Sequence, residues 1–190
     1  MILIIDICKE KLHYLEFVKP ICDILDNNKI KYFVKDYKKI TKKDLKGCSK
    51  FIICGTSLYD NEFVKNIKKF KWIMDFDKPI LGICGGMQII GLLFGGELKK
   101  KTEEGKNLLL KKTEIGFYKE VFNKNFLGLF GEVEVYHLHN NYLKFNNKMF
   151  EIYNGGNIAQ AIKHKEKEIY GVLFHPEVRN KDLIMRFCSL

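Results

Sequence analysis

The sequence predicts an α/β protein of three layers, in which helices cover both faces of a mostly parallel central sheet. Through the first half of the chain, short apolar runs alternate with segments of helical periodicity, as is typical of parallel strands joined by helical crossovers. In the second half, short strand-like segments follow one another, and we expect antiparallel additions to the sheet. With 190 residues, 46% of them hydrophobic, the chain is predicted to form a single domain over residues 1–190.

Hydrophobic periodicity predicts the elements of the first half. An unbroken apolar run predicts a buried strand over Met1–Ile7, and apolar residues at helical spacing predict a helix over Leu12–Leu25 that Pro20 kinks or restarts. Further along we expect three more strands and one lysine-rich amphipathic helix, namely strands at Ile30–Val34, Phe51–Cys54 and Pro79–Ile83, and the helix at Glu62–Met74.

The second half begins with a helix that covers Met87–Phe94 and stops at two glycines. Five strand-like segments follow, with the sequences KEVF, EVEVYHLH, MFEIY, IAQAIKH and IYGVLF. A last helix over Asp182–Cys188, capped by Asn180, is expected to close the chain.

The net charge of +10 does not indicate a nucleic-acid partner, because nearly all the basic residues are lysines. Arg179 and Arg186 are the only arginines, whereas phosphate and base recognition favours arginine. The densest basic runs, KKITKKDLK and LKKKTEEGK, also lack interleaved aromatic residues for base stacking. We interpret them as solvated lysine faces, with a docking face for an acidic partner as the alternative.

The N-terminal run MILII reaches Asp6 almost at once, so we expect neither a signal peptide nor a membrane span. The six cysteines form no Cys-x-x-Cys pair and no regular framework. Reduced thiols and a cytoplasmic location are therefore expected.

One cysteine stands out by its surroundings. In PILGICGGMQIIG, the apolar strand residues lead into Cys84, two glycines follow, and a helical pattern begins. Such a strand–turn–helix elbow turns the apical side chain outward, and the amides at the helix start favour a thiolate and can stabilise an oxyanion. The same residues also fit a small buried side chain in a tight connection, so a partner base has to decide between the two interpretations.

The segment GVLFHPEV supplies the candidate base. His175 and Glu177 stand two apart, and alternate side chains on a strand share a face. Glu177 could therefore orient His175 as the base that activates Cys84. Alone, this pair would also fit a surface histidine beside a surface acid, whereas together with the cysteine elbow it indicates catalysis.

These two motifs, in this order, resemble the class I (triad-type) glutamine amidotransferases across essentially the whole chain. Among the branches of that family, the chain most resembles the small stand-alone glutaminase subunits of GMP synthase. The resemblance implies a catalytic triad of Cys84, His175 and Glu177. It also implies supporting roles for six further residues: backbone amides of Gly55 and Gly85 as oxyanion donors, and Gln88, Gly116, Phe117 and His139 as substrate-binding residues.

The chain also departs from the family pattern. Members usually carry Gly-Gly-Pro or Gly-Pro-Gly after the third strand, whereas Cys54-Gly55-Thr56-Ser57 keeps only the first glycine. The sequence therefore does not establish what forms the second wall of the pocket. It does not establish the biosynthetic pathway either, because Leu173 replaces the usual glutamine before FHPE. The two histidines of HLH share a strand face, but no third ligand stands at a suitable spacing, so we predict no metal site.

The resemblance implies that glutamine is hydrolysed to glutamate and ammonia through a cysteinyl thioester, without a metal or organic cofactor. Because the chain has no nucleotide-binding motif, we expect the ammonia to pass to a separate synthetase subunit. Two alternatives remain: a γ-glutamyl hydrolase that acts alone, and a catalytically weak regulatory or binding subunit of the same fold.

Overall fold

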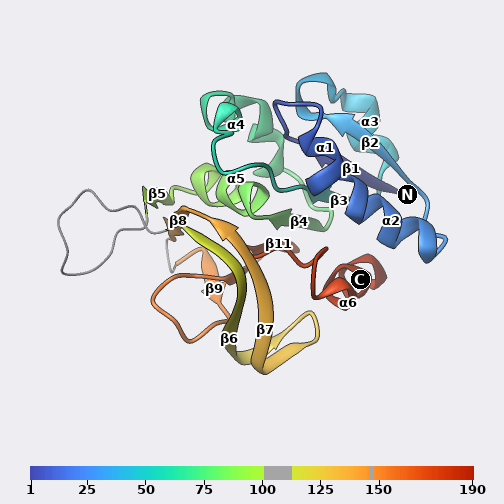
Figure 1. Ribbon diagram of the computed structural model, residues 1–190. Coiled ribbons are helices and arrows are strands. Elements are labelled where there is room, and N and C mark those ends of the chain that lie inside the picture. Colours follow the sequence, from blue (N-terminus) through green and yellow to red (C-terminus); the bar gives the residue numbers. More distant parts are fainter. Residues whose placement is uncertain (101–112, 146–147) are drawn as a thin grey trace.

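The computed structural model describes residues 1–100, 113–145 and 148–190 of the chain (Figure 1). Its first half contains β1 (Ile2–Asp6), α1 (His13–Phe17), α2 (Lys19–Asn27), β2 (Tyr32–Asp36), η1 (Tyr37–Lys39), α3 (Lys42–Gly47), β3 (Lys50–Ile53), α4 (Glu62–Lys65), η2 (Ile67–Ile73), β4 (Ile80–Ile83) and α5 (Gly85–Leu93). Its second half contains β5 (Glu97–Lys100), β6 (Glu114–Phe126), β7 (Leu129–His139), β8 (Asn141–Lys144), β9 (Phe150–Ile152), β10 (Ala161–His164), β11 (Ile169–Val172) and α6 (Lys181–Ser189).

Seven strands form the main sheet, in the order β2-β1-β3-β4-β11-β10-β9. The first five of these are parallel to one another, while β10 is antiparallel to both β11 and β9. The predicted α/β class, with a mostly parallel sheet and antiparallel additions from the second half, is confirmed.

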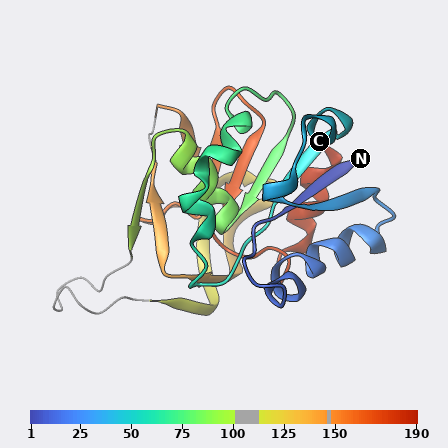
Figure 2. The same ribbon diagram turned by 90° about the horizontal axis from the view of Figure 1, so that it is seen from above.

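Both faces of the sheet are covered, because side chains that alternate along a strand point to opposite faces. Along β1, Ile2 and Ile4 pack with residues of α2 and α6, whereas Leu3 and Ile5 pack with residues of α3, η2 and α5. The long β6–β7 hairpin lies on the side of the sheet opposite α4 and α5 (Figure 1), and the view from above shows the helices on either side of the parallel strands (Figure 2). The sheet is therefore the middle of three layers.

The helix predicted over Leu12–Leu25 is divided into α1 and α2 at Val18. Pro20 stands in the first turn of α2, where its missing N–H costs no helical hydrogen bond, so it restarts the helix. Leu12 and Leu15 are exposed, so the apolar stripe predicted along the whole segment is buried only in its second part.

The prediction of a single helix over Glu62–Met74 was wrong. The structure has one α-helical turn in α4 and then the 3-10 helix η2, with the change at Asn66. The Asn66 side-chain amide donates to the Glu62 carbonyl oxygen at 3.0 Å, and such local bonds compete with the regular helical ladder.

Not all strands of the second half join the main sheet. β6 and β7 pair with each other in a long antiparallel ladder, and β5 pairs with β8 in a second small sheet. The two-residue turn between β6 and β7 has Leu127 and Gly128 at positive φ, which matches the twist of a tight hairpin. No described helix combines the length and the apolar character that crossing a membrane requires.

The connection between β4 and α5 depends on glycines where backbones nearly touch. A Cβ atom on Gly86 would lie 2.4 Å from the Ile53 carbonyl oxygen, and one on Gly82 would lie 2.5 Å from the Gly86 carbonyl carbon. These residues let α5 rest directly on β3 and β4, which fixes where the helix starts.

We predict that Gly86→Ala lowers the free energy of unfolding by about 1–3 kcal/mol, because the added methyl group forces rigid backbone apart. Gly47→Ala is the matched control, since a Cβ there meets nothing within 4 Å. The control is expected to gain about 0.5–1 kcal/mol from the better helix propensity of alanine. Urea denaturation measures both, and an unchanged midpoint for Gly86→Ala would contradict the packing argument.

Candidate active site

Cys84 occupies a strained turn between β4 and α5. Its φ of 48° and ψ of −101° are unusual for a residue with a side chain, and Cys84 is one of three non-glycine residues at positive φ among those described. The turn is held from both sides, because the Cys84 N–H donates to the Val172 carbonyl oxygen at 2.7 Å and the Gln88 N–H donates to the Cys84 carbonyl oxygen at 3.0 Å. Strain of this kind is concentrated at functional sites. The elbow predicted from the sequence is thus present.

His175 and Glu177 form a buried pair just beyond the end of β11. His175 Nδ1 lies 2.8 Å from Glu177 Oε1, and both side chains are about 1% exposed. The backbone N–H of His175 donates to the Tyr136 carbonyl oxygen of β7 at 2.8 Å, and the Phe17 ring packs against the imidazole at 5.5 Å between centroids. The carboxylate and these contacts fix the orientation of the ring.

Gly55, directly after β3, brings the cysteine and the histidine together. A Cβ atom at Gly55 would lie 2.7 Å from His175 Cε1 and 3.5 Å from Cys84 Cβ. The site therefore forms where the carboxyl ends of β3, β4 and β11 meet, the usual place for a site on a parallel sheet. Cys84 Sγ donates to the Leu138 carbonyl oxygen at 3.7 Å, and the thiol also interacts with the His175 imidazole.

Burial of His175 disfavours its charged form, but interactions with Glu177 and Cys84 outweigh burial and raise its pKa well above the usual range. The imidazole therefore stays protonated into the neutral pH range and can give a proton to a leaving group.

The other five cysteines have a raised pKa. Burial is the first cause at each of them: Cys8, Cys22, Cys48, Cys54 and Cys188, the last with a pKa of about 11. Inert thiols of this kind are typical of structural positions. All six cysteines are free.

A small cavity opens beside the Cys84 side chain. Among the residues predicted from the resemblance, Cys84, Gly85, Gln88 and His139 line it. The remaining lining residues were not singled out as ligands in the sequence: Thr56, Ser57, Leu58, Asp60, Asn61, Phe63, Leu138, Asn140 and Asn141. Most of these side chains are polar, and the cavity is suited to a small polar ligand.

The loop after β3 is ordered by a buried carboxylate that sequence reasoning missed. Asp60 accepts hydrogen bonds from Thr56 Oγ1 at 2.8 Å and from the Lys9 N–H at 2.6 Å, and its other oxygen accepts from the Glu62 N–H at 3.2 Å. An aspartate just before a helix start is a recognisable signal for such a turn. Thr56 and Ser57, the departure from the family pattern, thus lie in an ordered loop that forms one wall of the cavity.

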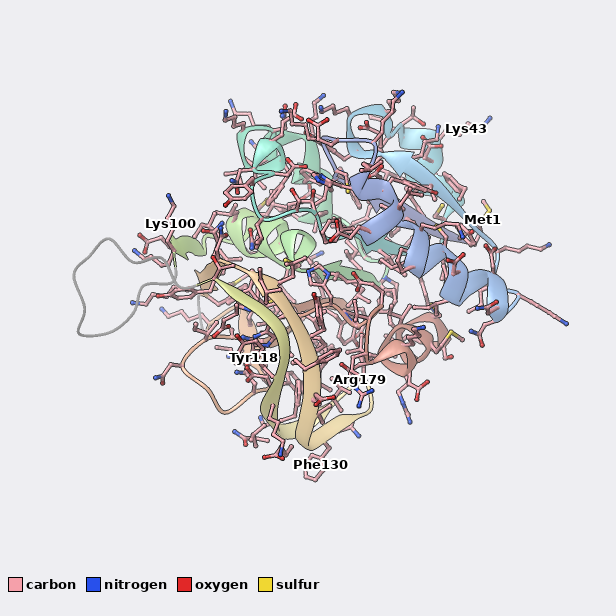
Figure 3. All side chains as sticks on the ribbon, in the orientation of Figure 1. Met1, Lys43, Lys100, Tyr118, Phe130 and Arg179 are labelled. Atoms are coloured by element: carbon pink, nitrogen blue, oxygen red, sulfur yellow. The ribbon has the colours of Figure 1, made fainter. Side chains whose placement is uncertain are left out.

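Gly116 and Phe117 are not among the residues that line this cavity. They belong to β6, where they pair with His137 and Tyr136, so the segment is a strand and not the expected loop, while substrate binding by these two residues stays a prediction. Alternation of more and less exposed residues continues through the segment, which favours a hairpin over a loop. The Phe117 ring is 57% exposed, and the guanidinium of Arg179, labelled in Figure 3, lies 6.0 Å from it.

The family model of the class-I glutamine amidotransferases matches residues 13–187. The chain therefore belongs to the class-I glutamine amidotransferase family, as its motifs predicted.

Curated relatives carry a more specific name. The chain is 36% identical over 112 residues to a glutamine-hydrolysing GMP synthase subunit of Methanobrevibacter smithii, a match that covers 58% of this chain and 56% of the relative. It is 37% identical over 118 residues to the protein of the same name from Methanocaldococcus jannaschii, covering 59% and 60% respectively. The matches thus span about three fifths of the length of these relatives.

Solved structures share the fold. A crystal structure from Thermoplasma acidophilum, described provisionally as a GMP synthase subunit, has a TM-score of 0.82 at 24% identity and covers 99% of this chain and 92% of that one. A glutamine amidotransferase from Thermotoga maritima has a TM-score of 0.70 at 20% identity, with coverage of 99% and 80%. At these identities the likeness concerns the fold alone.

We predict that Gly55→Ala slows alkylation of Cys84 by a glutamine-like diazo-ketone by about 100-fold, because its methyl group displaces the His175 ring. Gly47→Ala should leave the rate unchanged, since its methyl group is in open space. Mass spectrometry of labelled peptides gives the rate at each cysteine. Unaltered labelling of Cys84 in Gly55→Ala would show that the two side chains do not act together.

We also predict that Glu177→Gln lowers the pKa of His175. The carboxylate charge is what overcomes burial, and without it burial shifts the ring toward the neutral form, so the protonated fraction at neutral pH falls. An NMR titration of the His175 ring, compared with that of His13 in the same samples, measures the change. An unchanged or higher His175 pKa would mean that Glu177 does not set the charge of the site.

Proposed function

We propose that this protein is a glutaminase subunit that hydrolyses glutamine to glutamate and ammonia and delivers the ammonia to a separate synthetase subunit. The observation that carries the proposal is the meeting of the strained Cys84 with the buried His175–Glu177 pair at one edge of the sheet. Membership of the glutamine amidotransferase family supports the reaction class.

In the first half of the proposed reaction, the proton of the Cys84 thiol passes to His175, and the thiolate attacks the side-chain amide carbon of glutamine. The negative charge that develops on the amide oxygen is stabilised by the backbone N–H groups of Gly85 and Gly55. The tetrahedral intermediate then collapses, the carbon–nitrogen bond breaks, and His175 protonates the departing nitrogen to give ammonia. The raised pKa of His175 suits this role as an acid.

In the second half, His175 is left neutral beside a glutamyl thioester on Cys84. It accepts a proton from water, whose oxygen attacks the thioester carbon. Collapse of this second intermediate releases glutamate and the Cys84 sulfur, and His175 returns to its protonated form. Glu177 orients the ring through Nδ1 and stabilises its charge in both halves.

The cavity favours a small substrate over a long γ-glutamyl chain. Cys84 is only 5% exposed, and the lining beside it is largely polar. We assign Gln88 and His139 to binding of the glutamine, since both line the cavity beside the thiol. This arrangement supports free glutamine as the substrate and counts against the γ-glutamyl hydrolase.

The names of the relatives support a partner that uses the ammonia. Each of these relatives is by its name one part of a glutamine-hydrolysing GMP synthase. In this chain, the Leu138 carbonyl oxygen competes with His175 for the Cys84 thiol. We propose that the resting site is therefore slow and that docking of the synthetase subunit shifts the thiol from Leu138 toward His175.

Glutamate release tests the proposal, with the chain alone and mixed with the synthetase subunit of the same cell, its nucleotide and its acceptor. We expect slow release alone and a gain of about 10- to 100-fold in the mixture, equivalent to about 1.4–2.7 kcal/mol of transition-state stabilisation. Cys84→Ala should abolish release in both conditions. Cys188→Ala should not change it, because this thiol lies in α6, away from the cavity.

Two outcomes would favour the alternatives. Full speed without any partner would indicate a hydrolase that acts alone. No release with every synthetase tried, together with no thioester trapped on Cys84, would indicate a regulatory or binding subunit.

A further inference from the structure

Three metal-ligating side chains meet at the start of β6 and the end of β7. Glu114, His137 and His139 each offer one ligand atom, and these atoms all lie within 4.8 Å of one another. In the hairpin register, Glu114 stands directly opposite His139, and His137 is two residues before His139 on the same strand face. The third ligand that the sequence did not reveal thus comes from the neighbouring strand.

The distances between these groups suit a bound ion. His137 Nδ1 lies 3.1 Å and His139 Nε2 lies 3.4 Å from the same Glu114 oxygen, Oε2. Ligands at about 2.0–2.2 Å from a tetrahedral zinc ion are separated by about 3.3 Å. The distances from Glu114 Oε2 to His137 Nδ1 and to His139 Nε2 are therefore close to the distance between two ligands of one zinc ion.

The surroundings hold the donors in place. All three residues are buried, and His137 is 1% exposed. The ring of Tyr118, a β6 residue labelled in Figure 3, stacks on the His137 imidazole at 4.6 Å between centroids. Glu120 Oε1 lies 3.5 Å from His137 Nε2, the ring nitrogen that does not face Glu114. A carboxylate in this position orients a metal-bound histidine and raises its basicity.

We propose that Glu114, His137 and His139 bind a zinc ion. Imidazole nitrogens with one carboxylate oxygen are a ligand set that zinc prefers, whereas magnesium and calcium favour oxygen ligands alone. The site itself does not depend on the proposed function.

A zinc ion here would position the active site. Leu138, whose carbonyl oxygen accepts from the Cys84 thiol, stands between the two histidine ligands. His139 also lines the cavity beside Cys84. Joining β6 to β7 at this point would hold the Leu138 carbonyl and the cavity wall where the thiol needs them, which is a structural role and not one in the reaction.

Zinc content of the purified full chain, measured by mass spectrometry after loading with zinc and dialysis, tests the site. We expect one equivalent in the wild-type protein and in Cys84→Ala, whose ligands are intact although the reactive thiol is gone. The control His164→Ala removes an equally buried histidine outside the cluster and should also keep the ion. His137→Ala and the nearly isosteric Glu114→Gln should lose it.

Two further measurements separate metal binding from folding. Circular dichroism of metal-free Glu114→Gln should match that of the metal-free wild-type protein, while zinc should raise the melting temperature of the wild type only. Glu120→Gln should bind zinc about 10- to 100-fold more weakly, as expected for a residue that acts through a ligand.

The proposal would be overturned by a wild-type protein that retains no zinc. It would equally be overturned by zinc that is lost in Cys84→Ala, which would place the ion on the catalytic thiol, or by zinc that persists in folded Glu114→Gln and His137→Ala. Retention of zinc by a folded variant decides the question even if another variant fails to fold.

Discussion

The constraint on which the site depends is the turn at Cys84. A residue with a side chain holds a positive φ there only because its N–H is bonded to β11, its carbonyl is bonded within α5, and glycines let α5 approach the sheet. Release of any of these contacts would let the turn relax toward an ordinary conformation and move the thiol. The packing of α5 on β3 and β4 lies beneath the active site and is therefore needed to keep the thiol in position.

The β6–β7 hairpin, which is not part of the main sheet, also fixes the positions of the catalytic residues. The Tyr136 carbonyl oxygen holds the backbone of His175, and the Leu138 carbonyl oxygen accepts from the Cys84 thiol. His139 lines the cavity from the same strand. One strand thus contacts both members of the catalytic pair, and its placement sets the distance between them. A metal ion at the open end of this hairpin would hold these contacts in place.

The buried charges of His175 and Glu177 are a further constraint on the site. His175 and Glu177 are almost completely buried, and each is stable there only because the other compensates its charge. The arrangement raises the pKa of the histidine and keeps the ring in one orientation. A site of this kind depends on a charged neighbour fixed at 2.8 Å, so it tolerates little movement of the loop after β11.

The sequence by itself determined the fold class, the family and the strand–turn–helix elbow that carries Cys84, because hydrophobic periodicity and glycine spacing are local properties. It predicted His175 and Glu177 on one strand face, whereas both follow the end of β11 outside any strand. It did not determine the break at Asn66, where a side chain competes with the helix, or the separation of the hairpin from the main sheet. Asp60 as the organiser of the loop after β3 and Glu114 as the neighbour of two histidines were likewise decided by tertiary structure. Which residues of distant strands face one another depends on register and sheet order, and no local pattern in the chain specifies these.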